Sequence, residues 1–292
     1  MTDSPIKYAF VLPGVLTMIV IVIFPVGYAI RLSLSSWEIS AFGSGLDFAG
    51  LTQYAAVLQD SRFWHSLLVT FIIVFFAVSL EYVIGLSLAL ILTVELRGRR
   101  VFRVIFLVPM MVTAVIMALV WRTVLHESIG PINDILIRLS LPGIPWLSHN
   151  TVALISIIMV DFWQWTPFMF IILLAGLLSL PQDPYEAAVI DGASSWQIFR
   201  YITFELLYPV SVAVLLIRTI EAFKIMGTIF VLTSGGPGTS TESSSYYIWI
   251  RGLKEFQLGY SAAMAFTYLI ILTIGLIIFS KLLRKRISPR KL

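Results

Sequence analysis

Three charged residues interrupt an apolar stretch of the sequence, residues 206–232. Arg218, Glu221 and Lys224 are spaced by three, so on a helix Glu221 lies between the two cations on one broad face and can pair with either. A charged side chain at the centre of a bilayer costs about 2.5–3.5 kcal/mol on insertion scales. Mutual neutralisation and the lining of a polar cavity for a solute explain this pattern equally well.

A second set of polar and aromatic residues recurs at helical spacing in the apolar stretch before it. Asp161, Gln164, Trp165 and Phe168 stand at i, i+3, i+4 and i+7, and therefore project from one side of a helix. Aromatic faces and amide groups together suit a sugar, whose ring faces are apolar and whose edges carry hydroxyls. Ordinary helix packing, with tryptophan near a membrane interface, explains the same residues and is somewhat favoured.

Glu81 stands alone among apolar residues near the middle of another stretch. We expect this carboxylate to pair with a neighbouring helix rather than to contact a substrate. On the sequence alone, replacing Glu221 by glutamine is therefore expected to impair transport or assembly more than the same change at Glu81.

A short segment, residues 181–205, joins the two apolar stretches that carry these polar groups. Asp183, Pro184 and Glu186 are placed as an N-cap, a first-turn proline and the third residue of a helix, which is close to a capping box. The sequence therefore predicts that a short helix begins here.

The same segment predicts a turn and a second helix. Gly192 suits the C-terminal stop of the first helix, and Ser194–Gln197 offers a second capping box for a helix that runs toward Ile202. We call residues 181–205 the elbow. An ordinary connector between membrane helices explains the capping signals too, but small residues and acidic acceptors suit contact with another protein: Ala187, Ala188, Glu186 and Asp191.

The composition places these groups in a bilayer. Hydrophobic residues make up 59% of the 292 residues and charged residues 12%, and the mean hydropathy is +0.94. A helix needs about 20 apolar residues to cross the hydrocarbon, and continuous runs of this length favour helices over the alternating strands of a barrel. The first run is too long for a signal peptide and lacks an evident cleavage site. We expect an all-α polytopic protein with six membrane helices, at about 8–30, 67–93, 101–121, 152–179, 206–232 and 261–280.

Basic residues set the expected orientation. With both termini in the cytoplasm, the outer loops hold six basic residues: Arg31, Arg62, Arg122, Arg138, Arg251 and Lys254. The cytoplasmic parts hold 12 of the 20, although they are shorter: Lys7, Arg97, Arg99, Arg100, Arg103, Arg200, Lys281, Arg284, Lys285, Arg286, Arg290 and Lys291. The positive-inside rule therefore places the elbow in the cytoplasm, between helices four and five. The net charge of +4 then needs no nucleic acid to explain it.

Several chemistries find no support in the sequence. The chain has no cysteine, its three histidines lack the spacing of metal ligands, and no constellation of nucleophile and base is evident. A phosphate-binding loop of the form G-x-x-x-x-G-K-[ST] is absent, so the chain itself has no recognisable means of hydrolysing ATP. Energy for transport must arrive from partners at the elbow or from an ion gradient. The second possibility, an ion-coupled secondary transporter, should show inverted repeats, which are not clear here.

The elbow reads EAA-x-x-x-G from Glu186 to Gly192, with Ile202 ten residues beyond the glycine. It resembles the docking loop of membrane-spanning permease subunits of ATP-binding-cassette importers. The resemblance to the carbohydrate-uptake type, which includes maltose and glycerol-phosphate permeases, covers nearly the whole chain. One departure is that Phe204-Glu205 replaces the usual Leu-Pro, with a proline only at Pro209. The matching segments include Trp163 to Phe168, Ala175 to Leu177, Gly50 to Tyr54, Phe63-Trp64, Val231 to Gly238 and Gly259 to Ala263.

The resemblance implies a function for the whole chain, residues 1–292, as a single permease domain. It implies a second permease subunit, two ATPase subunits that use ATP and Mg²⁺, an extracytoplasmic solute-binding protein, and a location in the bacterial inner membrane. This chain itself would bind no cofactor or metal. Its substrate would be a sugar or a derivative, with disaccharide, glycoside, polyol and phosphorylated or sulfonated forms all open. The residues implied in coupling to the ATPases are Glu186, Ala187, Ala188, Asp191, Gly192, Ala193 and Ile202.

Overall fold

The computed structural model describes residues 6–37, 47–93 and 99–284. Throughout these ranges the regular structure is helical, apart from an isolated antiparallel bridge between Ser35 and Phe48. The basic residues outside the described ranges are Arg97, Lys285, Arg286, Arg290 and Lys291. Among the described residues, five helices are long and apolar enough to cross a membrane, and a bent pair brings the number to six if it forms one span.

The chain folds as two compact units. Unit 1 contains residues 1–64 and 247–272, and unit 2 contains residues 65–246 and 273–292. The first span is built from α1 (Ile6–Met18), a π-helical turn η1 (Ile19–Ile23) and α2 (Phe24–Ser33). The other helical elements outside unit 2, or shared with it, are α3 (Thr52–Gln59), α4 (Ser61–Thr93), α13 (Ser244–Trp249), the π-helical turn η3 (Ile250–Lys254) and α14 (Leu258–Arg284).

Helix α4 begins at Ser61, six residues before the predicted span, because Asp60 caps it. The Asp60 carboxylate accepts hydrogen bonds from the backbone N–H groups of Arg62, at 2.9 Å, and Phe63, at 3.3 Å. These are donors that a helix N-terminus leaves unpaired. The helix is 33 residues long, or about 50 Å at 1.5 Å per residue, which exceeds the roughly 30 Å of hydrocarbon.

The predicted third span is broken. It consists of α5 (Arg99–Met111) and α6 (Ala114–Val124), which are bent by 100°. Thr113 has an extended backbone, and Pro109 removes one helical N–H group just before the bend. A kink of this size needs support for the carbonyls that it frees.

The predicted fifth span differs at both ends. A continuous helix runs from Ser195 to Ala222, through α10 (Ser195–Ile198), a π-helical turn η2 (Phe199–Thr203) and α11 (Phe204–Ala222). The prediction that helix five continues to residue 232 is wrong, because α11 ends at Ala222 and a separate α12 (Gly227–Leu232) follows. Lys224 therefore lies in the turn after α11 and not inside a helix. The chain thus leaves the elbow as an unbroken helix in spite of Pro209.

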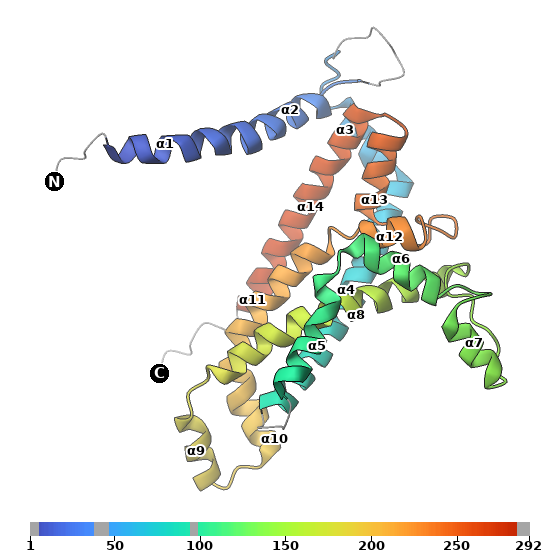
Figure 1. Cartoon of the computed structure of the whole chain (residues 1–292). Helices are drawn as coiled ribbons and strands as arrows, with labels where there is room; N and C mark the ends of the chain where they lie inside the picture. Colours follow the sequence, from blue (N-terminus) through green and yellow to red (C-terminus); the bar gives the residue numbers. More distant parts are fainter. Residues whose placement is uncertain (1–5, 38–46, 94–98, 285–292) are drawn as a thin grey trace. The chain divides into compact units, whose positions relative to one another are not determined.

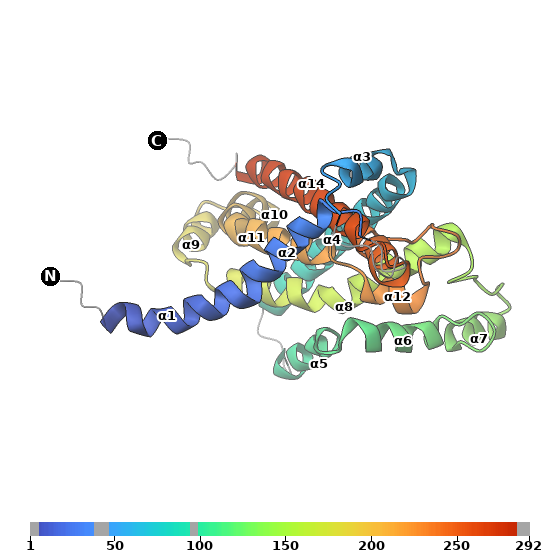
Figure 2. The same cartoon turned by 90° about the horizontal axis from the view of Figure 1, so that it is seen from above.

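Unit 2 is organised around α8 (Asn150–Leu178), a helix with buried residues on most of its faces. It packs against α5, α11 and α12, while α12 also packs on α6, as both views show (Figures 1 and 2). Close crossing of α4 and α8 is possible because Gly85 has no side chain: a Cβ there would lie 2.8 Å from the Met169 Cβ. The remaining helices of the unit are α7 (Pro131–Arg138) and α9 (Asp183–Ile190).

Candidate functional site

The elbow has the two helices and the turn that its sequence predicts. Helix α9 joins the end of α8 to α10 (Figure 1). Gly192 closes α9 with a φ of +71°, and the N–H of Ala193 reaches the carbonyl of Ala188 at 2.9 Å, the bonding of a Schellman motif. A residue with a side chain would be strained at this φ. Glycine therefore fixes the direction in which the chain leaves α9.

Of the two helix caps predicted in the elbow, one is confirmed and the other is shifted by one residue. The Ser194–Gln197 capping box is complete: the Ser194 N–H donates to Gln197 Oε1 at 2.7 Å, and the Gln197 N–H donates to Ser194 Oγ at 3.4 Å. The prediction of Asp183 as N-cap is off by one residue. Gln182 holds that position, because its carbonyl accepts the first helical hydrogen bonds from Tyr185 and Glu186.

The elbow is tied to the start of the long helix. The Tyr185 hydroxyl of α9 donates to Thr203 Oγ1 of η2 at 3.1 Å, and Ala188 is buried. Ala188 is therefore a packing residue within the elbow, whereas Glu186, Ala187, Asp191 and Gly192 are exposed. These contacts join α9 and the Ser195–Ala222 helix.

Large apolar side chains are exposed in the elbow along with the acids. The sequence analysis did not select these apolar residues. Ile190 is 85% exposed, Tyr201 71% and Trp196 69%, and Val189 is also exposed. Exposed apolar patches mark contact surfaces. The signal was present as apolar residues inside a connecting loop. A concavity of about 320 Å³ opens beside them, lined by Asp191, Gly192, Ala193, Gln197, Ile198, Tyr201 and Ile202.

A buried ion cluster joins three helices of unit 2. Arg218 of α11, whose side chain is 1% exposed, donates from Nε and Nη2 to the two carboxylate oxygens of Glu81 on α4, at 2.7 and 2.8 Å. Nη2 also donates to Asp161 Oδ2 on α8. The guanidinium carbon lies 4.9 Å from the ring centre of Trp165. We call Glu81, Asp161 and Arg218 the ion cluster.

The ion cluster shows which of the candidate residues chosen from the sequence lie together in the structure. Glu81 pairs with a neighbouring helix, as expected, and two candidate stretches meet through Asp161 and Arg218. Of the two cations with which Glu221 could pair, Arg218 is bound by Glu81 and Asp161. Glu221 pairs instead with Lys224 at 2.6 Å, and both side chains are largely exposed, at 44% and 61%. Pairings 57 and 137 residues apart leave no local signal in the sequence.

Gln164 is buried beside the break between α5 and α6. Its Nε2 donates to the Val112 carbonyl at 2.9 Å, which satisfies a group that the bend frees. Its Oε1 has no hydrogen-bond partner within the described ranges. Trp165 and Phe168 are half-buried, and their rings meet edge to face at 6.1 Å. One acceptor and two aromatic rings thus retain the capacity to contact a polar ligand.

Comparison with known proteins shows the family to which this chain belongs. Residues 81–291 match the family described as binding-protein-dependent transport system inner membrane component. The chain belongs to this family. The matched region begins at Glu81 and includes both the elbow and the whole ion cluster. Family membership confirms the expectation of an inner-membrane permease subunit of an ATP-binding-cassette importer and removes the case for an ion-coupled secondary transporter.

Relatives of this family member align along most of its length. The trehalose/maltose transport system permease protein MalF of Thermococcus litoralis is 39% identical, over 94% of this chain and 92% of that protein. The sulfoquinovosyl glycerol transport system permease protein SmoG of Agrobacterium fabrum is 31% identical, over 90% and 85%. The crystal structure of a bacterial ABC transporter that imports the acidic polysaccharide alginate contains a chain with the same fold, with a TM-score of 0.80, 24% identity and coverage of 97% and 96%.

Proposed function

We propose that this chain is one of two permease subunits of an importer for a sugar or sugar derivative, driven by ATP that partner subunits hydrolyse. The elbow carries the proposal, because it combines a fixed turn with exposed apolar and acidic groups. Relatives named for trehalose, maltose and sulfoquinovosyl glycerol support the substrate class. The chain would act as a single permease domain, residues 1–292, with six spans in which α5 and α6 count as one.

The elbow would lie in the cytoplasm, together with both termini, and dock in an ATPase subunit. The residues offered for contact are Glu186, Ala187, Asp191 and Gly192, with Ala188, Ala193 and Ile202 shaping the surface. ATP and Mg²⁺ would act only in the partner subunits, and a solute-binding protein would deliver the substrate on the other side. ATP binding closes the ATPase pair, and the elbow passes that movement to the permease halves, which alternate between inward-open and outward-open.

The substrate pathway would use the groups that keep free capacity. Gln164 Oε1 can accept from a sugar hydroxyl, and the faces of Trp165 and Phe168 suit the apolar face of a sugar ring. Arg218 and Asp161 would position the helices through the ion cluster, because their charges are already matched. Glu221 and Lys224, which are exposed, would add polar lining at the end of α11.

The test is to purify a tagged copy from its native membrane in mild detergent and to identify the co-purifying chains by mass spectrometry. A second permease and an ATPase are expected, with ATP hydrolysis that rises when the solute-binding protein and a suitable sugar are added. Isolation of the chain without an ATPase, together with uptake driven by an ion gradient, contradicts the proposal.

A further inference from the structure

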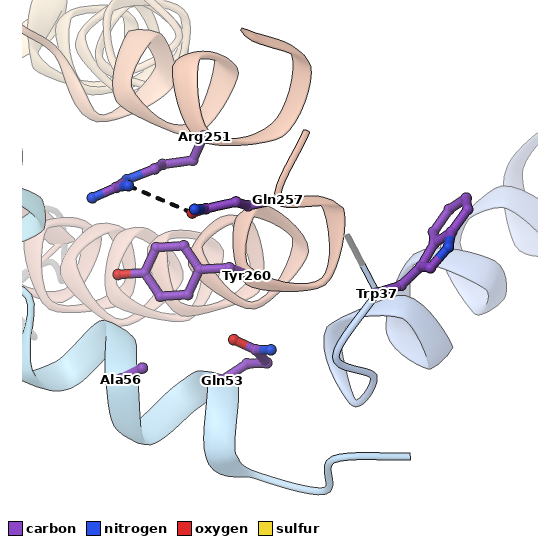
Figure 3. Close-up of a pocket in the computed structure, with 6 residues that line it drawn as sticks. All are labelled: Trp37, Gln53, Ala56, Arg251, Gln257 and Tyr260. Atoms are coloured by element: carbon purple, nitrogen blue, oxygen red, sulfur yellow. Dashed lines mark hydrogen bonds between the residues drawn. The ribbon is translucent and has the colours of Figure 1, made fainter. Parts of the chain in front are cut away.

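Unit 1 contains a pocket of about 270 Å³, which Figure 3 shows in close-up. Trp37, which follows α2, borders it on one side, and α3 contributes Gln53 and Ala56 on another. Arg251 of η3 and the neighbouring Gln257 and Tyr260 complete the wall. We call this the Trp37 pocket. Its lining brings two aromatic rings, two amides and one guanidinium to a single cavity.

The wall formed by Arg251 is held in place by hydrogen bonds. Its Nε donates to the Tyr247 hydroxyl at 2.9 Å, and its Nη1 donates to Glu255 Oε2 at 2.8 Å and lies 3.5 Å from Gln257 Oε1. The hydroxyls of Tyr247 and Tyr260 both donate to Asp60 Oδ2 at 2.7 Å. Side chains fixed in this way lose little freedom when a ligand binds, so the pocket is preorganised.

The charges around the pocket are matched. Arg251 pairs with Glu255, and Asp60 accepts hydrogen bonds from two tyrosines and two backbone N–H groups. The guanidinium therefore presents N–H donors without an unmatched positive charge. A neutral polar ligand suits such a wall better than a strongly acidic one, because the acid would compete with Glu255 for Arg251.

Gln53 supplies unused hydrogen-bonding capacity. In the part of the chain that the structure describes, its amide makes no hydrogen bond, and it faces the pocket in Figure 3. The Gln257 amide accepts from Arg251 through its oxygen, which leaves its NH₂ group as a donor. An amide offers both donors and acceptors, as a hydroxyl does. These two groups match a ligand rich in hydroxyls.

The pocket has room for about one ring. A cavity of about 150 Å³ holds a benzene molecule, so 270 Å³ has room for a six-membered ring that carries hydroxyls. We propose that the Trp37 pocket is a binding subsite for one neutral sugar ring, formed by residues other than those of the proposed substrate pathway. Trp37 and Tyr260 would cover the apolar ring faces, and Gln53, Gln257 and Arg251 would hydrogen-bond its hydroxyls. The proposal rests on the proposed function for the identity of the solute.

The test uses the full chain with its co-purified partners in lipid nanodiscs, without the solute-binding protein. Maltose and trehalose serve as probes, followed by tryptophan fluorescence and saturation-transfer NMR. Trp37→Phe is expected to remove the pocket's fluorescence response. Gln53→Ala is expected to raise its apparent Kd about 3- to 10-fold, the effect of losing one hydrogen bond. Gln59→Ala, an exposed change of the same type on the same helix, is the matched control and should have no effect.

Two outcomes overturn the proposal. In the first, sugar binding is the same in the parent complex, Trp37→Phe and Gln53→Ala. In the second, these variants weaken capture of the purified solute-binding protein but leave the sugar response intact, so that the pocket receives a protein side chain. Failure of the proposed function is recognised separately, because the parent chain would then lack its ATPase partner or would show no sugar-stimulated ATP hydrolysis.

Discussion

The elbow and the ion cluster depart from the usual distribution of polar and apolar groups in opposite directions. The elbow exposes Ile190, Trp196 and Tyr201, whereas the ion cluster buries one guanidinium and two carboxylates. In the cluster every charged group has a partner from another helix. In the elbow Trp196 meets the ring of Phe199 and Arg200 lies near the ring of Tyr201, but the apolar side chains stay largely exposed. The difference agrees with the roles proposed for them, internal packing for the buried charges and association for the exposed apolar groups.

Arg218→Met is the strongest test of this division. The change leaves Glu81 and Asp161 buried without the cation that pairs with them. Removing one partner of a buried ion pair lowers the free energy of unfolding by about 3–5 kcal/mol. We expect a large fall in the thermal unfolding temperature of the purified chain and in its yield from the membrane. Lys224→Met is the matched control, because its exposed pair is worth about 0–1 kcal/mol. Equal thermal stability of the two variants would show that the cluster contributes nothing to packing.

Changes at Gly192 should affect transport much more than folding, the reverse of what is expected for Arg218. The space beside this residue is open, since a Cβ placed there would have no other atom within 4 Å. The cost of Gly192→Trp to folding is therefore the strain of its φ, about 1–2 kcal/mol. Transport and retention of the ATPase should nevertheless be lost, because a large side chain would stand on the proposed docking surface. Gly192→Asn, which tolerates this φ, is the control and should keep both. Normal uptake by the tryptophan variant contradicts a docking role.

Glutamine replacements at two glutamates sharpen the contrast between buried and exposed charge. For stability we expect the opposite order to the one that the sequence suggests for transport or assembly, because Glu81 is buried against Arg218 and Glu221 is exposed beside Lys224. Glu81→Gln is expected to cost about 1–3 kcal/mol, through loss of a charge-assisted bidentate contact. Glu221→Gln should cost less than about 1 kcal/mol. Unfolding temperatures of both variants in one detergent check the order.

The smallest effect on stability is expected for a change at Asp60, whose carboxylate accepts hydrogen bonds from two tyrosine hydroxyls. Burial alone would raise its pKa, but the hydrogen bonds from Tyr247, Tyr260 and two backbone N–H groups outweigh burial and hold the pKa below its ordinary value. Since the folded pKa is the lower one, the stability that Asp60 contributes is complete above the unfolded pKa, about 3.9, and is lost as the pH falls through the folded pKa.

Asp60→Asn should flatten this dependence. Unfolding temperatures of the parent and the variant, measured from about pH 6 to about pH 3, are expected to converge at the acidic end, where the parent carboxylate becomes protonated. Burial and the bond to Asp60 also raise the pKa of Tyr247 to about 12, so this tyrosine remains a donor over the whole range. A constant difference between the two proteins down to the acidic end contradicts the role given to the carboxylate.

Much of the fold follows from local sequence signals. Continuous apolar runs predict most of the spans, and the Ser194–Gln197 box and Gly192 predict the second half of the elbow, because capping depends on residues only three or four positions apart. The break after Met111 was not predicted. Its support comes from Gln164, which lies 52 residues further along the chain than Val112.

The candidate site was less predictable for the same reason. Helical spacing places Glu221 near Arg218, but spacing does not report which face of α11 is buried or where that helix ends. The end of α11 at Ala222 leaves Lys224 in a turn, where it meets Glu221, and Arg218 turns to partners on α4 and α8. Local pattern thus predicted the polar residues, whereas their pairing depended on tertiary packing.

The continuous helix from Ser195 to Ala222 connects the elbow to residues far along the same helix. At 1.5 Å per residue, Arg218 lies about 35 Å along this helix from its first residue. A tilt of about 10° about one end would displace the other by about 6 Å, close to the 5.4 Å pitch of one helical turn. Under the proposed docking role, the helix would act as a lever arm whose capped end lies in the elbow. Near its far end Arg218 is held by Glu81 and Asp161, so a displacement of the elbow would also strain these ion pairs.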